Sequence, residues 1–159
     1  MIDENYINYI YDTYSNTILK ISYTYLKSTQ LSEDILQEVI LKIIKKKIKI
    51  EDKTKEKYWI IRVTINMCKD YLKSSWHRKN VELDEKLSYL PKEQNDILTQ
   101  VLSLPEKYKT VIYLYYYEEY SIKEISKILK TNESTIGTRL SRGKSILQNK
   151  LKEEWNDEE

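Results

Sequence analysis

The stretch "SIKEISKILKTNESTIGTRLSRGKSIL", Ser121 to Leu147, decides the fold of the C-terminal part of the chain. Ser121 with Glu124 three residues later forms a capping box, in which each side chain satisfies a free backbone N–H of the first helical turn. The residues "KTN" follow, and Asn132 is a favourable N-cap for a second helix. Helix, three-residue turn and helix is the spacing of a helix-turn-helix, although a purely structural helical hairpin has the same spacing.

The second of these helices has two different faces. At about 100° per residue, one face is apolar and is expected to be buried; it carries Ile136, Leu140, Gly143 and Leu147. The rest of the helix carries hydroxyl and basic side chains: Ser134, Thr138, Arg139, Ser141, Arg142, Lys144 and Ser145. Short hydroxyl side chains let a backbone approach the major groove while arginine reaches a guanine edge or a phosphate. We therefore interpret this face as a surface that reads duplex DNA.

Both glycines of the chain lie in this helix, where each costs about 1 kcal/mol relative to alanine. We expect Gly143 on the buried face, where a small residue lets the first helix of the pair cross closely and where alanine is tolerated. We expect Gly137 on the flank, where it removes bulk beside DNA. Neutral drift at a solvent-exposed position is the alternative for Gly137.

The whole chain of 159 residues predicts an all-α fold, because it holds only two Gly and two Pro and its apolar residues recur mostly every three or four positions. We predict helices over residues 4–27, 32–48, 56–75, 95–103, 106–118, 121–129 and 132–153. The acidic segment between the third and fourth lacks a sustained period. The sequence therefore predicts two small helical domains, 1–80 and 97–159, joined by a flexible linker over 81–96.

Charge and composition bound the function. Residues 1–80 hold 15 basic against 10 acidic side chains and residues 97–150 hold 9 against 5, whereas the connector and the C-terminal tail are acidic. Two basic blocks fit bipartite contact with a polyanion, and an ordinary mixed surface fits equally well. Without a membrane-length apolar run or a signal peptide, and with Cys68 as the single cysteine, we expect a cytoplasmic protein that does not insert into membranes. Because the sequence offers no phosphate loop, paired metal ligands or nucleophile with a base, we expect no catalytic residue, metal or cofactor.

The segment "LSEDILQEVILKII", Leu31 to Ile44, predicts an amphipathic helix with a wide apolar stripe. The stripe consists of Ile35, Leu36, Val39, Ile40, Ile43 and Ile44. The opposite face carries Asp34, Gln37, Glu38 and Leu41, at i, i+3, i+4 and i+7. A leucine among carboxylates on an exposed face suggests a docking site for a basic partner helix, although a scattered surface leucine is the alternative.

The segment "YWIIRVTINMCKDYLK", Tyr58 to Lys73, predicts a helix with a basic stripe. The expected buried face is Ile61, Thr64, Ile65, Cys68 and Leu72, and another face carries Arg62, Asn66, Lys69 and Lys73. One amide among three cations is able to hydrogen-bond a base while the cations hold phosphates. The lysine-rich run at 42–50 is interpreted as a solvated helix end and loop.

In their order and spacing, these blocks resemble a bacterial extracytoplasmic-function sigma factor of the sigma-70 family. "SEDILQEVILKI" resembles the helix that docks on core RNA polymerase, and "WIIRVTINMCKDYL" resembles the helix that recognises the melted minus-ten element. The segment from "LPEKYK" to "GKSIL" resembles the minus-thirty-five domain. The resemblance implies core RNA polymerase, promoter DNA and an anti-sigma factor as partners. It gives Asp34, Gln37 and Glu38 the docking role, and places Asn66 beside the captured minus-ten base.

The chain departs from the family pattern at several positions. Gly137 stands where the family usually has a basic residue, Gly143 where alanine is usual, and Ile40 where phenylalanine is common. The promoter sequence therefore does not follow from the resemblance. A self-sufficient helix-turn-helix regulator and a helical adaptor without a nucleic-acid role are the rival hypotheses.

Overall fold

The computed structural model describes residues 3–74 and 95–157, and within them it contains seven helices and no strand. The chain divides into two units, Met1–Leu90 and Pro91–Glu159. The predicted all-α fold is confirmed. The predicted linker over 81–96 lies outside the described residues except for its last two positions, which begin a helix.

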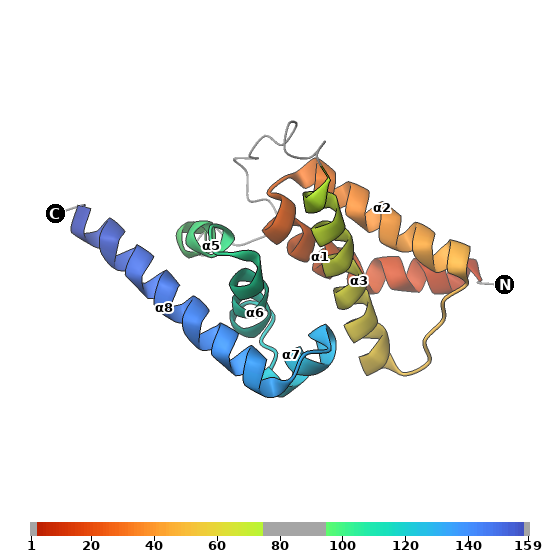
Figure 1. The fold of residues 1–159 in the computed structure, drawn as a ribbon. Coiled ribbons are helices and arrows are strands. Elements are labelled where there is room, and N and C mark those ends of the chain that lie inside the picture. The colour runs from red at the N-terminus through yellow and green to blue at the C-terminus, as the bar shows by residue number, and fades with distance from the viewer. Residues whose placement is uncertain (1–2, 75–94, 158–159) are drawn as a thin grey trace. The chain divides into compact units, whose positions relative to one another are not determined.

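The first unit is a bundle of three helices, α1 (Glu4–Leu26), α2 (Thr29–Lys46) and α3 (Lys53–Lys73). Helices α1 and α2 form an antiparallel hairpin, and α3 packs across both (Figure 1). All three contribute side chains that are almost completely buried: Ile18, Ile21, Val39, Ile43, Ile61, Ile65 and Cys68. Apolar residues at three- and four-residue spacing thus meet in one core.

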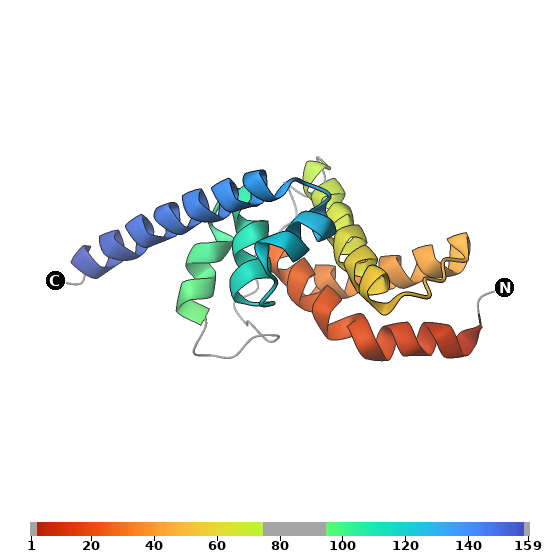
Figure 2. The same cartoon turned by 90° about the horizontal axis from the view of Figure 1, so that it is seen from below.

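The second unit consists of α5 (Asn95–Leu102), α6 (Glu106–Tyr116), α7 (Ile122–Leu129) and α8 (Glu133–Asp157). Helix α8 contacts each of the other three, and its C-terminal half runs away from α7 (Figures 1 and 2). The core of this unit is formed by Leu104, Val111, Ile112, Leu114, Ile125, Ile128 and Ile136.

Two helices begin earlier than the sequence predicts, and both differences come from caps. The Ser28 hydroxyl accepts a hydrogen bond from the Leu31 backbone N–H, and α2 begins at Thr29 rather than at 32. The Asp52 carboxylate accepts one from the Lys55 backbone N–H, and α3 begins at Lys53 rather than at 56. These caps satisfy backbone donors that are otherwise free in a first turn.

Three helices end at a C-cap residue that adopts the left-handed backbone conformation although it is not glycine. The C-caps of α1, α2 and α7 are Lys27, Lys47 and Lys130, with φ of 54°, 52° and 53°. Neither glycine has positive φ. A left-handed backbone conformation therefore does not explain either glycine of α8.

Candidate nucleic-acid and partner-binding surfaces

The first candidate surface is the outer face of α2. Its buried side chains, among them Ile35, Leu36, Val39 and Ile43, turn the opposite side of the helix to solvent. On that side all the predicted docking residues are exposed: Asp34, Gln37, Glu38 and Leu41. The Leu41 side chain is 41% exposed. Burial, with a smaller contribution from the Asp34 carboxylate, raises the pKa of the Tyr71 hydroxyl on α3.

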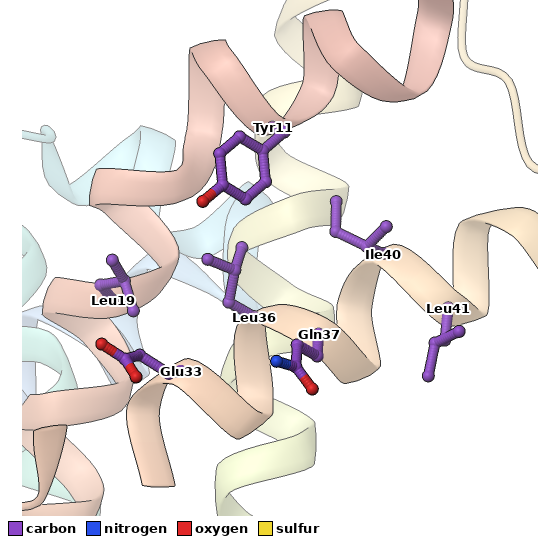
Figure 3. Close-up of a pocket in the computed structure, with 7 residues that line it drawn as sticks. All are labelled: Tyr11, Leu19, Glu33, Leu36, Gln37, Ile40 and Leu41. Atoms are coloured by element: carbon purple, nitrogen blue, oxygen red, sulfur yellow. The ribbon is translucent and has the colours of Figure 1, made fainter. Parts of the chain in front are cut away.

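A groove of about 570 Å³ between α1 and α2 borders this face. It is lined by Tyr11, Leu19, Glu33, Leu36, Gln37, Ile40 and Leu41. Figure 3 shows Tyr11 reaching from α1 toward Leu36 and Ile40 of α2. Gln37 and Leu41, two of the predicted docking residues, thus belong to both the exposed face and the groove.

The groove corrects two expectations about the apolar stripe. Ile40 is only half-buried, and Ile44 is 46% exposed. The reason is that α1 and α3 cover a narrower arc of α2 than the six-residue stripe spans. Tyr11, which is 51% exposed, was not identified from the sequence, because its contribution depends on how α1 pairs with α2.

The second candidate surface is the basic stripe on α3. Asn66 and Lys73 are exposed, and Arg62 and Lys69 are half-exposed. The opposite face is buried as predicted, apart from the half-buried Leu72. The buried Thr64 hydroxyl there donates to the Ile60 carbonyl at 2.7 Å.

The stripe has one member that the sequence analysis missed. Lys55 is exposed and lies seven residues before Arg62, which places it on almost the same side of the helix. From Lys55 to Lys73 the stripe extends about 27 Å along α3, at about 1.5 Å per residue. The seven-residue spacing between Lys55 and Arg62 is visible in the sequence. Lys55 was missed because the helix predicted from the sequence began at residue 56.

The third candidate surface lies on the helix-turn-helix of α7 and α8. The predicted capping box is present: the Ser121 hydroxyl accepts from the Glu124 N–H, and the Glu124 carboxylate accepts from the Ser121 N–H, both at 3.1 Å. The predicted cap of α8 is present too, since the Asn132 side-chain oxygen accepts from the Thr135 N–H at 2.7 Å. The structure exposes Ser134, Thr138, Ser141, Arg142, Lys144 and Ser145, and half-exposes Arg139.

The glycines of α8 occupy different surroundings. A Cβ atom on Gly137 would meet nothing within 4 Å, which agrees with the predicted flank position. A Cβ atom on Gly143 would lie 3.0 Å from Cγ1 of Ile112 and 3.1 Å from Cβ of Tyr108. Both of these residues belong to α6. The helix that crosses closely at Gly143 is therefore α6, not the first helix of the helix-turn-helix, and an added methyl group is not accommodated without movement.

Two negative findings concern the described residues only. Within residues 3–74 and 95–157, the structure has no group of three or more His, Cys, Asp or Glu side chains arranged to hold a metal ion. Over the same ranges, no helix combines the length and the apolar character needed to cross a membrane.

Comparison with known proteins identifies both units. The family model described as Sigma-70 region 2 matches residues 10–78, and the model described as Sigma-70, region 4 matches residues 94–147. The ECF RNA polymerase sigma factor SigM of Bacillus subtilis is 29% identical, over 96% of this chain and 99% of the relative. SigW of the same organism is 27% identical, over 91% of this chain and 88% of the relative.

A solved structure has the same fold. It is the sigma factor RpoE in complex with the anti-sigma factor NepR from Bartonella quintana, with a TM-score of 0.70 and 16% identity over 94% of this chain and 98% of that one. Two family regions in sequence order, relatives that align over nearly their full length, and this shared fold agree with one another. The chain belongs to the sigma-70 family of RNA polymerase sigma factors, in its extracytoplasmic-function branch.

Proposed function

We propose that this chain is a group 4 sigma factor that directs core RNA polymerase to a small set of promoters and performs no chemistry itself. One observation carries the proposal. A three-helix unit holds both an exposed acidic face on α2 and a basic stripe on α3, and a helix-turn-helix unit with an exposed hydroxyl-and-arginine face follows it in the same chain.

The α2 face is proposed to bind the polymerase. Asp34 and Glu38 supply negative charge that selects and steers a basic partner, and charge of this kind acts more on orientation and association rate than on affinity. Leu41 and the neighbouring groove supply apolar surface whose burial contributes affinity. An exposed leucine beside a groove, one turn after the Glu38 carboxylate, has no role in the core of the unit.

The α3 stripe is proposed to hold the melted minus-ten strand. Asn66 has both a donor and an acceptor for a base edge, while Arg62, Lys69 and Lys73 offer positive charge to phosphates. A single strand is the appropriate target, because its bases are free to present their edges.

The α8 face is proposed to read the minus-thirty-five duplex through Thr138, Ser141 and Arg142, with Ser134, Arg139, Lys144 and Ser145 around them. Gly137 supplies no cation where the family usually has one. We therefore propose that this chain makes one phosphate or base contact fewer there, and that its promoter differs accordingly.

The remaining proposals concern partners and location. The structurally similar RpoE is bound by an anti-sigma factor, and we propose an anti-sigma partner for this chain as well. We propose that the protein acts in the cytoplasm, where the polymerase and the promoter are found.

The experiment is run-off transcription of fragmented genomic DNA by Bacillus subtilis core polymerase, with and without the chain, followed by sequencing of the transcripts. We expect discrete new 5′ ends that require the chain. A stand-alone regulator would bind duplex fragments without producing transcripts, and a helical adaptor would do neither. Absence of new transcripts, with polymerase shown to be active by its principal sigma factor, would refute the proposal.

A further inference from the structure

Helix α8 is held along one line of its surface, which consists of Ile136, Gly143 and Lys150. These residues are seven positions apart, so at about 100° per residue they lie on nearly the same side of the helix. Ile136 and Gly143 are both buried. From Ile136 to Lys150 this contact line extends about 21 Å along α8, at about 1.5 Å per residue. It therefore runs behind the exposed face that we propose to read DNA.

The middle of the contact line lies against α6, which runs beside α8 (Figures 1 and 2). A Cβ atom on Gly143 would be 3.0 Å from Cγ1 of Ile112 and 3.1 Å from Cβ of Tyr108. Ile112 is itself buried in the core of the unit. Because the two helices leave no room for a methyl group, glycine sets the distance between α6 and α8 at this point.

The C-terminal end of the contact line is tied to the turn between α5 and α6, residues 103–105. The Lys150 ammonium donates hydrogen bonds to the Ser103 hydroxyl at 2.9 Å and to the Ser103 carbonyl at 3.3 Å. The same hydroxyl donates to the Gln100 carbonyl, in the last turn of α5, at 2.7 Å. That turn of α5 carries no basic residue of its own, and a cation is favourable beside the partial negative charge of a helix C-terminus. Lys150 thus joins α8 to the end of α5.

These contacts fix the rotation of α8 about its own axis. Thr138 and Ser141 lie on the side opposite to Gly143, and Arg142 lies about 100° from it. A rotation of about 20° would move an atom at the helix surface, about 5–6 Å from the axis, by about 2 Å. Hydrogen bonds to base edges form over a donor–acceptor range of only about 0.5 Å. A small rotation would therefore break base contacts, whereas attraction between cations and phosphates would persist.

We propose that Gly143 and Lys150 are positioning residues for minus-thirty-five recognition, which set the rotation of α8 at which its exposed face reaches the bases. Gly143 acts through α6, and Lys150 acts through the turn at Ser103. This role depends on the proposed reading of duplex DNA by α8. Loss of either contact should lower sequence discrimination more than affinity for DNA in general.

The contact of Lys150 is tested with the full chain and a random library of 20-bp duplexes, from which bound duplexes are sequenced. We expect the wild-type chain to enrich one motif. Lys150→Met should lower the ratio of affinities for the enriched duplex and a scrambled duplex by about tenfold, which is the discrimination that one base contact supplies. The matched control Lys152→Met removes the same charge from an exposed side chain of the same helix and should keep the wild-type ratio. Lys150→Arg retains a donor for Ser103 and should keep most of it.

The contact of Gly143 with α6 is tested independently by Gly143→Ala. The added methyl group should lower the same ratio and change the preferred bases, while affinity for the scrambled duplex stays close to that of the wild-type chain. Partial unfolding alone would weaken binding to both duplexes equally, so the ratio separates positioning from stability. If Gly143→Ala and Lys150→Met leave the ratio unchanged, or if Lys152→Met lowers it as much as Lys150→Met does, the positioning role is wrong.

Run-off transcription separates the possible failures. Transcription that requires the chain, together with an affinity ratio that ignores both substitutions, would refute this inference and leave the proposed function standing. A wild-type chain that enriches no motif would refute the inference together with the proposed reading of duplex DNA by α8. Absence of transcripts as well would refute the proposed function itself.

Discussion

Gly137→Ala and Gly143→Ala make the same chemical change in one helix, and the structure predicts opposite effects on stability. Each substitution removes the glycine penalty in a helix, a gain of about 1 kcal/mol. At Gly137 nothing opposes that gain, because an added Cβ meets no atom within 4 Å. Gly137→Ala should therefore stabilise the second unit by about 1 kcal/mol.

At Gly143 the added methyl group meets α6. Its distances to Ile112 Cγ1 and Tyr108 Cβ would be 3.0 and 3.1 Å, compared with about 3.5–4.0 Å at optimal carbon–carbon contact. The Ile112 side chain is able to rotate slightly, but Tyr108 Cβ is fixed to the backbone, so α6 must move away from α8. Overpacking of this kind costs about 1–3 kcal/mol, and after the helix gain Gly143→Ala should destabilise the unit by up to about 2 kcal/mol.

Amide hydrogen exchange of α6, measured by mass spectrometry on the full chain, reports this difference locally. A change of about 1 kcal/mol alters the exchange rate about fivefold. We expect slower exchange in Gly137→Ala and faster exchange in Gly143→Ala. If both variants slow exchange equally, α6 and α8 separate without cost, and close helix approach does not explain the glycine.

Four other predictions follow from exposed or buried positions. Glu38→Lys should weaken co-purification with core polymerase while circular dichroism stays unchanged, because the side chain is exposed; wild-type recovery would contradict the docking role. Asn66→Ala should reduce open-complex formation more than initial promoter binding. Unchanged permanganate footprints of the melted region would show that Asn66 has no role in holding the melted strand. Lys130→Gly should raise the urea midpoint, with a gain of about 1 kcal/mol, because a φ of 53° strains a side chain that glycine lacks. Burial, together with the Glu56 carboxylate, raises the pKa of the Tyr6 hydroxyl from 10.0 to about 12. The contribution of Tyr6 to stability is therefore present below pH 10 and is lost as the pH rises through 12. The melting temperature should fall more steeply between pH 10 and 12 in the wild-type protein than in Tyr6→Phe.

The sequence predicted what depends on local geometry. Helix periodicity is set by the backbone alone, so the exposed faces of α2, α3 and α8 could be placed before any tertiary structure was known. The capping box at Ser121 and Glu124 and the cap at Asn132 depend on residues within one turn, and both are present. The roles proposed for these faces remain predictions.

What the sequence did not predict depends on neighbours far along the chain. The groove beside α2 exists because Tyr11 of α1 lies opposite Ile40. The partner of Gly143 could not be inferred from its helix, because a small residue indicates a close approach without saying which helix approaches. Glu56 lies in a lysine-rich, strongly polar segment, and only tertiary contact with α1 tyrosines 42 to 50 residues away buries it.

The composition gives a physical reason for that buried carboxylate. The chain has 15 tyrosines and no phenylalanine, so its buried aromatic positions bring hydroxyl groups into the interior. A buried hydroxyl requires a hydrogen-bond partner, and a carboxylate is able to accept from several at once. Glu56 accepts from three tyrosines in the first unit, and in the second unit the Glu118 carboxylate accepts from the buried Tyr113 at 2.8 Å. Where a small helical protein builds its interior with tyrosine and without phenylalanine, acidic residues that accept from those hydroxyl groups are drawn to the core, as the buried Glu56 and the half-buried Glu118 are here.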